Sequence, residues 1–293
     1  MIGIVGLGKM GRAIAERLTG EGESLVVWNR TPGKAEGLEQ VTEVSSPAEV
    51  VAASPVTLSV LANDTAIDAV YRGPNGLLSA PLEGQVIVEM CTTSPDRAAS
   101  LEADVKAVGG LFLECPVGGT IGPARNGKLL GLAGGSDAAF AAARPTLEQI
   151  TRRLEHLGPA GSGAAMKLAI NLPLMVYWGA LGEALGLALD RGIDINQAAD
   201  ILIDSSGAIG AAKGRVPPIR DLIATGEAGG VAFSLSNALK DMGLMEELAA
   251  DGGRSHDVIS AVRARAEAAA AAGYADLDAS MLAAFGHRDL SSD

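Results

Sequence analysis

The spacing of apolar residues divides the chain into two halves. In the first half, short apolar runs alternate with stretches in which apolar residues recur at helical spacing. That alternation is typical of an α/β fold, a doubly wound parallel sheet with helices on both faces. We expect strands at residues 2–5, 24–29, 56–61, 86–89, 111–114 and 129–133. Ligands of such sheets bind in the loops that follow the strands.

The second half lacks this alternation and is predicted to be helical. Helices are expected over residues 164–191, 195–204, 235–250 and 257–272, with a loop through Val216, Pro217 and Pro218. A glycine-rich turn between Gly158 and Gly163 separates the halves, because this composition favours a turn. The sequence therefore predicts an α/β domain over residues 1–161 and an all-α C-terminal domain over residues 162–293.

A glycine motif follows the first predicted strand and precedes a predicted helix. It reads Gly6, Leu7, Gly8, Lys9, Met10 and Gly11. In this context Gly6 allows a tight turn, Gly8 lets a pyrophosphate approach the backbone, and Gly11 lets the helix pack close to its strand. The phosphates would bind N–H groups at the helix N-terminus. We therefore expect residues 6–11 to bind a dinucleotide in a Rossmann-type domain, rather than to form a glycine turn without a ligand.

The end of the second predicted strand indicates which dinucleotide is preferred. NAD-selective domains usually place Asp or Glu there to bind the ribose hydroxyls. This chain has Asn29, Arg30 and Thr31 instead. Arg30 can stack on the adenine and pair with a 2′-phosphate, because a guanidinium binds phosphate well. We predict NADP(H) in preference to NAD(H); the alternative is that Arg30 is a solvated surface residue.

Composition and charge limit the other function classes. The 293 residues carry a formal net charge of −12, which disfavours a nucleic-acid partner because phosphate binding needs clustered Lys and Arg. No continuous run of about eighteen apolar residues occurs, so no transmembrane helix and no membrane partner are expected. The first residues also lack the pattern of a signal peptide. We expect a small-molecule partner.

The cysteines and histidines indicate neither a disulfide nor a metal site. Cys91 and Cys115 have no framework spacing, which favours small buried filler residues in a reducing cytoplasm. His156, His256 and His287 are scattered, and their spacing does not resemble a zinc site. We therefore expect no metal and no histidine base.

Lys167 is the first candidate for acid–base chemistry. It lies one helical turn before Asn171, and Leu174 and Trp178 continue the same helix face as an apolar stripe. One interpretation is a lysine that snorkels to the surface. The other is a proton donor beside a carbonyl, because burial can lower the pKa of a lysine towards the working pH.

Two further segments are candidates for the site. Lys240 and Asp241 lie on a predicted helix, where such a pair by itself indicates a solvated face. Gly118, Gly119 and Thr120 follow a predicted strand and can present backbone N–H groups to an anion such as a carboxylate. The alternative for residues 118–120 is a structural turn.

These motifs occur together, in this order, in one family. The chain resembles the β-hydroxyacid dehydrogenases, which belong to the 6-phosphogluconate dehydrogenase superfamily, over nearly its full length. The matching positions are the glycine motif, residues 90–95 with Thr92, residues 116–119, Gly161, Gly163, Lys167, Asn171 and Lys240.

The resemblance implies an NAD(P)-dependent oxidoreductase for a small β-hydroxyacid, semialdehyde or 2-oxoacid. It implies that Lys167 is the general acid/base, that Asn171 holds the substrate, and that Lys240 reaches the active site. It also implies a substrate loop at residues 118–120, Thr92 near the nicotinamide, and a homodimer. Leu61, at the end of the third predicted strand, is expected beside the cofactor.

The chain departs from the family pattern around the expected substrate. The family loop commonly reads Pro-Val-Ser-Gly-Gly, whereas this chain has Gly118 at the serine and Thr120 at the second glycine. A missing donor at a desolvated carboxylate costs about 1–3 kcal/mol, which Thr120 can restore. Ile170 replaces the first of two adjacent asparagines, and Pro173 is expected to kink the helix. These changes argue against a typical 3-hydroxyisobutyrate substrate.

Two other functions remain open. Imine reductases share the fold, the dimer and the Asn-Arg-Thr signature, but they usually have another residue, often Asp or Tyr, at the position of Lys167. A non-catalytic dinucleotide sensor tends to lose that lysine. Because Lys167 is present, we favour hydride transfer between NADP(H) and a carbonyl, with Lys167 exchanging the proton.

Overall fold

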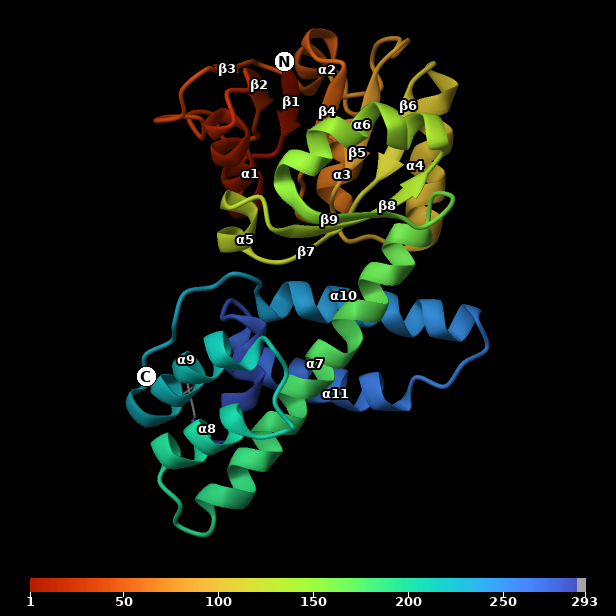
Figure 1. The fold of residues 1–293 in the computed structure, drawn as a ribbon. Coiled ribbons are helices and arrows are strands. Elements are labelled where there is room, and N and C mark those ends of the chain that lie inside the picture. The colour runs from red at the N-terminus through yellow and green to blue at the C-terminus, as the bar shows by residue number, and fades with distance from the viewer. Residues whose placement is uncertain (289–293) are drawn as a thin grey trace. The chain divides into compact units, whose positions relative to one another are not determined.

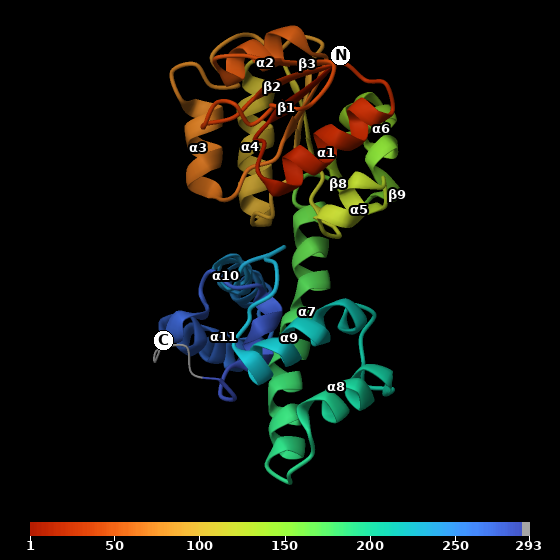
Figure 2. The same ribbon diagram turned by 90° about the vertical axis from the view of Figure 1, so that its left-hand side faces the viewer.

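The computed structural model describes residues 1–288, and the chain divides into two units (Figures 1 and 2). The first unit is Met1–Lys167 and the second is Leu168–Asp293, whose last five residues, 289–293, lie outside the described residues. Helix α7 (Ser162–Leu189) begins in the first unit and continues into the second.

A nine-stranded sheet forms the centre of the first unit. Its strands lie in the order β3-β2-β1-β4-β5-β6-β8-β7, and β9 pairs with β8. The pairs from β3 to β6 are parallel, whereas β8 is antiparallel to β6 and β7. The strands are β1 (Ile2–Val5), β2 (Leu25–Trp28), β3 (Val41–Glu43), β4 (Val56–Ser59), β5 (Val86–Glu89), β6 (Leu111–Glu114), β7 (Val117–Gly118), β8 (Leu129–Gly135) and β9 (Thr151–His156).

The mostly parallel sheet confirms the predicted fold class, but two features of the sheet differ from expectation. One end of the sheet is antiparallel, and β3, β7 and β9 were not predicted. Strands β3 and β7 have only three and two residues, and β9 carries exposed Arg152 and Arg153. Strands this short or this polar lack the continuous apolar run that identifies a strand buried on both faces.

Helices cover both faces of the sheet, which gives the first unit three layers (Figure 2). Helices α1 and α6 enclose one core with Ile4 and Leu58 of the sheet. Helices α2, α3 and α4 enclose the other with Val5 and Ile87, because successive strand residues point to opposite faces. The helices are α1 (Lys9–Gly20), α2 (Pro47–Ala53), α3 (Asp64–Arg72), α4 (Pro95–Ala107), α5 (Ile121–Arg125) and α6 (Asp137–Ile150).

The second unit consists of helices around one apolar core that includes Trp178, Ile219, Met242 and Tyr274. This confirms the helical C-terminal region. Besides α7, its helices are α8 (Ile195–Asp204), α9 (Ala212–Thr225), α10 (Leu235–Asp251) and α11 (Asp257–Ala269), a π-helical turn (Ala270–Tyr274) and a 3-10 helix (Ala279–Ala284).

Helix α9 lies where a loop was expected, so that prediction is wrong. Pro217 and Pro218 each lack the N–H that an α-helix requires. The helix forms nevertheless because Val216, Ile219 and Leu222 are buried on its inner side. Burial of an apolar face outweighs the local preference for a loop.

Helix α7 continues through Pro173 and contains only two charged residues, Lys167 and Glu183. By length and composition it could cross a membrane, with a mean hydropathy of 1.4 over a window that is 33% buried. The criterion of an uninterrupted apolar run did not single out this helix, because Lys167, Asn171 and Glu183 interrupt it. One such helix is weak evidence for a membrane, because core helices of soluble proteins have the same composition.

Candidate active site

The glycine motif forms a close turn between β1 and α1 in the first unit. Gly6 has a φ of +99°, a left-handed conformation that favours glycine. A Cβ at Gly6 would lie 2.3 Å from the carbonyl oxygen of Val60, and a Cβ at Gly11 would lie 1.9 Å from the carbonyl oxygen of Gly6. Only glycine therefore lets α1 approach the sheet this closely.

Gly8 has the opposite surroundings. It is exposed, and no heavy atom lies within 4 Å of where its Cβ would be. It is also the N-cap residue of α1 and provides no side chain to cap the helix. Open space beside the N-terminus of a helix suits a pyrophosphate. Residues 6–11 therefore fit the phosphates of a dinucleotide.

Asn29 links the glycine motif to the end of β2. Its Oδ1 accepts a hydrogen bond from the backbone N–H of Leu7 at 2.9 Å, and its Nδ2 donates to the carbonyl oxygen of Thr31 at 2.8 Å. The Asn29 amide thus shapes the loop. Arg30 and Thr31 are exposed where an adenosine ribose was predicted.

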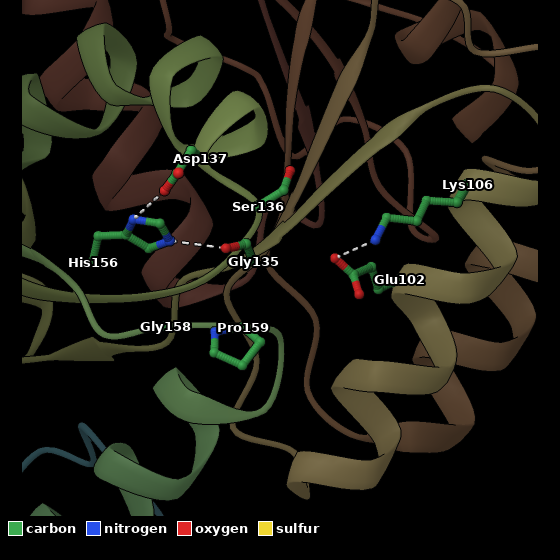
Figure 3. A pocket seen from close by; sticks show the side chains of 8 residues that line it. All are labelled: Glu102, Lys106, Gly135, Ser136, Asp137, His156, Gly158 and Pro159. Atoms are coloured by element: carbon green, nitrogen blue, oxygen red, sulfur yellow. Dashed lines mark hydrogen bonds and ion pairs between the residues drawn. The ribbon is translucent and has the colours of Figure 1, made fainter.

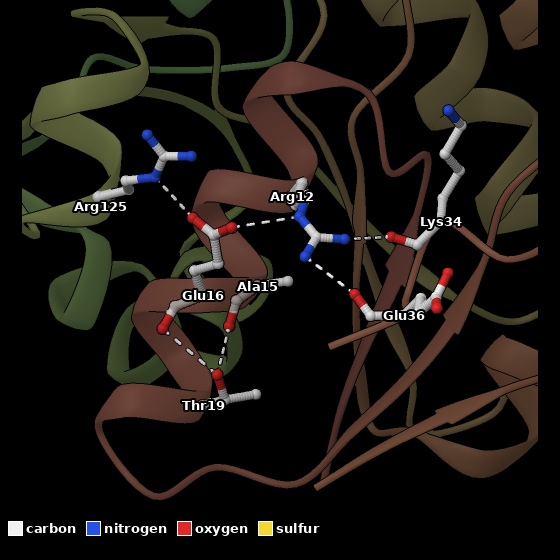
Figure 4. Close-up of polar contacts among 7 residues, drawn as sticks. All are labelled: Arg12, Ala15, Glu16, Thr19, Lys34, Glu36 and Arg125. Carbon is white, nitrogen blue, oxygen red and sulfur yellow. Dashed lines mark hydrogen bonds and ion pairs between the residues drawn. The ribbon is translucent and has the colours of Figure 1, made fainter. Parts of the chain in front are cut away.

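A polar network that the sequence pattern did not predict supports this region (Figure 4). Arg12 of α1 donates to the carbonyl oxygens of Lys34 at 2.7 Å and Glu36 at 3.0 Å, in the loop after β2. Glu16 accepts from Arg12 at 3.2 Å and from Arg125 at 2.6 Å, and both arginines lower the pKa of Glu16. The spacing of Arg12 and Glu16 on α1 is the one local signal for this network.

Leu61 and Thr92 lie in loops at the carboxyl ends of β4 and β5. Leu61 is half-buried, and its Cδ2 lies 3.2 Å from where a Cβ of Gly6 would be. Leu61 therefore adjoins the glycine motif. Thr92 is half-buried.

A buried carboxylate that was not predicted holds the backbone next to Thr92. Glu89, the last residue of β5, accepts hydrogen bonds from Ser59 Oγ at 2.7 Å, Tyr71 Oη at 2.9 Å and the Cys91 N–H at 2.8 Å. Burial raises the pKa of Glu89 to about 7, although these hydrogen bonds oppose the shift. Its only sequence signal is an acid that ends an apolar strand.

The segment 118–120 leaves β7 and begins α5. Gly119 has a φ of +127°, and a Cβ there would lie 2.9 Å from Leu129, so glycine is required. A Cβ at Gly118 would meet Leu130 at 3.4 Å, an ordinary contact, so this position can hold a side chain. The Thr120 hydroxyl makes no capping hydrogen bond to α5.

Lys167 is the last residue of the first unit and lies half-buried in the second turn of α7. Glu114, the last residue of β6, accepts hydrogen bonds from backbone N–H groups at the start of that helix. The structure therefore places Lys167 just beyond the point where α7 is tied to the sheet. The sequence pattern did not predict the role of Glu114.

In the second unit, Asn171 and Lys240 both contact Asp241. The Asn171 Nδ2 donates to one carboxylate oxygen at 3.0 Å, and the Lys240 Nζ lies 3.2 Å from the other. Asp241 is only 1% exposed and lies beside Met242 on the buried face of α10. The interpretation of Lys240 and Asp241 as a solvated pair is therefore wrong for Asp241. The structure brings Asn171, Lys240 and Asp241 into one cluster.

The cysteines are buried, as expected for filler residues. Neither Cys91 nor Cys115 is in a disulfide, and burial raises the pKa of Cys115 to about 12. Within residues 1–288 there is no group of three or more His, Cys, Asp or Glu side chains that could hold a metal ion.

A hollow of about 510 Å³ on the first unit contains none of the predicted site residues (Figure 3). Lys106 and Glu102 pair at 2.9 Å on one side of it. On the other side, His156 stacks on Phe140 and its Nε2 lies 2.8 Å from the carbonyl oxygen of Gly135. The polar groups of Lys106, Glu102 and His156 thus have partners within the protein, which argues for a structural role.

Two family models match the chain. Residues 1–158 match the NAD binding domain of 6-phosphogluconate dehydrogenase, and residues 161–285 match the NAD-binding domain of NADP-dependent 3-hydroxyisobutyrate dehydrogenase. The chain is 31% identical to glyoxylate/succinic semialdehyde reductase 1 of Arabidopsis thaliana, over 94% of this chain and 95% of the relative.

Solved structures are similar over most of the chain. The 3-hydroxyisobutyrate dehydrogenase of Mycobacterium tuberculosis, in a structure with L-serine, has a TM-score of 0.81 and 28% identity, covering 96% of this chain and 97% of that one. An imine reductase of Streptomyces aurantiacus has a TM-score of 0.62 and 25% identity with the same coverage.

Proposed function

Since the chain belongs to the β-hydroxyacid dehydrogenase family and is an oxidoreductase that binds a nicotinamide dinucleotide, we propose that it transfers hydride between NADP(H) and a small hydroxyacid, semialdehyde or 2-oxoacid. One observation carries the proposal. The first unit combines a phosphate cradle at residues 6–11 with Lys167 on a helix tied to the sheet. The reductase and dehydrogenase named above support the substrate class.

In this proposal Lys167 exchanges the proton. The bound nicotinamide supplies or accepts the hydride, and the protein supplies position and charge. Lys167 protonates the carbonyl oxygen during reduction and removes the hydroxyl proton during oxidation. Its half-buried position limits the water around the ammonium. Asn171 and Lys240 are proposed, by resemblance to the family, to hold the substrate.

We attribute a preference for NADP(H) to Arg30. The position after β2 offers no carboxylate to ribose hydroxyls, and the Asn29 amide bonds to the backbone of Leu7 and Thr31. Arg30 is exposed, so its guanidinium can meet a 2′-phosphate. The description of the matching model as NADP-dependent also supports this preference.

We propose that the substrate carries a carboxylate and that residues 118–120 bind it. The Thr120 hydroxyl is not used to cap α5, which supports its use as a donor in place of the missing serine. Gly118 leaves room at that serine position. This combination favours a substrate whose carboxylate lies closer to Thr120 than to Gly118.

Lys167→Ala tests the proposed mechanism. Removal of the proton donor is expected to lower kcat by about 10²- to 10⁴-fold. The Kd for NADPH, measured by fluorescence titration, should not change. Lys106→Ala is the matched control, because that lysine pairs with Glu102 on the outer helix α4 and should leave kcat unchanged. Full turnover by Lys167→Ala would overturn the assignment.

Imine reduction is the second candidate. The similarity to an imine reductase and the glycine at position 118 favour it. Purified protein should be assayed for NADPH and NADH oxidation with glyoxylate, succinic semialdehyde, methylmalonate semialdehyde and a cyclic imine. Turnover of the carbonyl compounds supports the first proposal, and turnover of the imine alone replaces it.

We also propose a homodimer formed through the end of α7 and α8. Leu187 is 78% exposed, Ile201 60% and Ile193, in the loop between the two helices, 40%, and the family resemblance implies a dimer. Leu187→Glu is expected to reduce the mass measured by light scattering from dimer to monomer. A native protein that is already monomeric contradicts the proposal.

The cytoplasmic location stays a prediction.

A further inference from the structure

The carboxylate of Glu114 occupies the N-terminus of α7. It is 2% exposed, and it accepts hydrogen bonds from the N–H groups of Gly161 at 2.6 Å, Gly163 at 2.8 Å and Ala164 at 3.2 Å. The remaining N–H of this turn, that of Ser162, donates to the carbonyl oxygen of Pro159 at 3.1 Å. A helix start has four N–H groups without helical partners, and Glu114 satisfies three of them.

The surrounding backbone is built closely around this carboxylate. A Cβ at Gly134 of β8 would lie 2.3 Å from the Glu114 Oε1, and a Cβ at Gly163 would lie 2.2 Å from the carbonyl oxygen of Leu132. Gly161 has a φ of +101° and no side chain to cap the helix. The helix start is therefore held by a residue 47 to 50 positions earlier in the chain.

We propose that Glu114 is a positioning residue, which fixes the first turn of α7 and thereby sets the place of Lys167 relative to the strand-end loops of the first unit. Lys167 follows the last hydrogen-bonded residue, Ala164, by less than one helical turn. Rotation or fraying of the first turn therefore moves the lysine directly. The inference rests on the proposed function, because it requires that Lys167 exchanges a proton with the substrate.

Two opposing effects act on the Glu114 carboxyl group at this place. A carboxylate at a helix N-terminus is stabilised by the helix dipole and by charge-assisted hydrogen bonds. Burial acts in the other direction and raises the pKa of Glu114 to about 7, against the three N–H donors. A neutral amide replaces this group incompletely: its oxygen can accept from Gly161 and Gly163 at the Oε1 position, but its NH₂ group then faces the N–H of Ala164, and the negative charge is lost.

Glu114→Gln tests the inference, with Ser136→Ala as the matched control. Ser136 caps α6 through its Oγ, which accepts from the Ala139 N–H at 3.2 Å, and α6 carries no residue of the proposed mechanism. Both variants should lower Tm by a few degrees. Only Glu114→Gln should lower kcat, by about 10- to 100-fold, because a small displacement of an acid group costs this much. Glu114→Asp keeps both oxygens and the charge and should retain more activity.

Two readouts separate positioning from general stability. Amide hydrogen exchange in residues 161–167 should accelerate in Glu114→Gln and not in Ser136→Ala, while the Kd for NADPH stays the same in both. Equal kcat values for these two variants, at a temperature where both are folded, would overturn the inference. If Glu114→Gln does not fold, the same comparison is made with Glu114→Asp.

Lys167→Ala, measured in parallel, distinguishes the two possible failures. Loss of turnover in Lys167→Ala with full activity in Glu114→Gln overturns the positioning role alone. Full turnover in Lys167→Ala overturns the proposed function, and the positioning role with it.

Discussion

Helices α1 and α7 both begin at a glycine against the sheet of the first unit, yet their N-termini are completed differently. Helix α1 begins after Gly8, which offers no cap and has open space beside it. Helix α7 begins after Gly161, and Glu114 fills its first turn with three hydrogen bonds. The N–H groups of a helix start thus face space for a ligand's phosphates in one place and the protein's own carboxylate in the other.

This difference matches what each helix has to do. In the proposed function the phosphates at α1 would belong to a cofactor that leaves after turnover, so the anion there would be exchangeable. The carboxylate at α7 is part of the chain, so that helix start is satisfied whether or not cofactor is bound. A helix that presents a candidate proton donor gains from this permanent anion, because the position of the donor decides its efficiency.

The largest effect on stability and cofactor binding is expected from a substitution at the start of α1. Gly11→Ala places a Cβ 1.9 Å from the backbone of Gly6, so α1 must move. The free energy of unfolding should fall by about 1–3 kcal/mol or more, and the Kd for NADPH should rise more than about 100-fold. Urea unfolding and fluorescence titration measure the two quantities.

Gly8→Ala is the matched control for that substitution. No atom lies within 4 Å of the new Cβ, so the free energy of unfolding should be nearly unchanged. The methyl group does enter the space assigned to the pyrophosphate, so NADPH binding should weaken. Equal losses of stability in the two variants would contradict the role given to Gly11.

A second effect, on the pH dependence of stability, concerns Glu89, the buried acid at the end of β5. The pKa of Glu89 is raised from 4.5 to about 7, so the folded state binds the extra proton between these pH values. Its contribution to the free energy of unfolding is present below pH 4.5 and is lost as the pH rises through about 7.

Glu89→Gln cannot ionise and escapes this loss. The stability of the variant relative to the native protein should therefore rise by about 1–3 kcal/mol between pH 5 and pH 8. Urea unfolding at the two pH values measures this difference. A difference that is independent of pH would show that the Glu89 carboxylate does not titrate in this range.

The smallest effect on cofactor binding is expected from Arg30, in the loop after β2. Arg30→Ala should raise the KM for NADPH about tenfold, through loss of a charge-assisted contact to the 2′-phosphate. The KM for NADH should change much less, because NADH keeps the adenine on which Arg30 can stack but lacks that phosphate. Steady-state kinetics with both cofactors measures the ratio, and an equal change for both would contradict the proposed NADP preference.

Much of the fold could be predicted locally. The six predicted strands lie within two residues of their expected bounds, because most of them are short apolar runs. The short and polar strands β3, β7 and β9 could not be identified in this way. Helix α9 was missed because its two prolines gave a strong local signal that burial of Val216 and Ile219 overrides.

The candidate site also contains residues that local sequence could predict and residues that it could not. Gly6 and Gly11 have roles that follow from local backbone geometry, a positive φ at Gly6 and a close approach of Gly11 to the Gly6 carbonyl, and Gly8 has open space beside it. Asp241 was predicted to be solvated and is buried, because a charged pair in the sequence of one helix does not show which residues the helix packs against. Its contact with Asn171 joins residues 70 positions apart.

By itself, the sequence determined a dinucleotide-binding turn, an α/β unit followed by helices, and a lysine on the first long helix. Those features follow from residue type and short-range spacing, which set backbone freedom and apolar periodicity. Only the tertiary structure decided that Glu114 would complete the start of α7 and that Glu89 would hold the backbone beside Thr92. The physical reason is that a buried carboxylate takes its hydrogen-bond partners from whatever the fold brings within 3 Å or so, and local sequence carries no record of that neighbour.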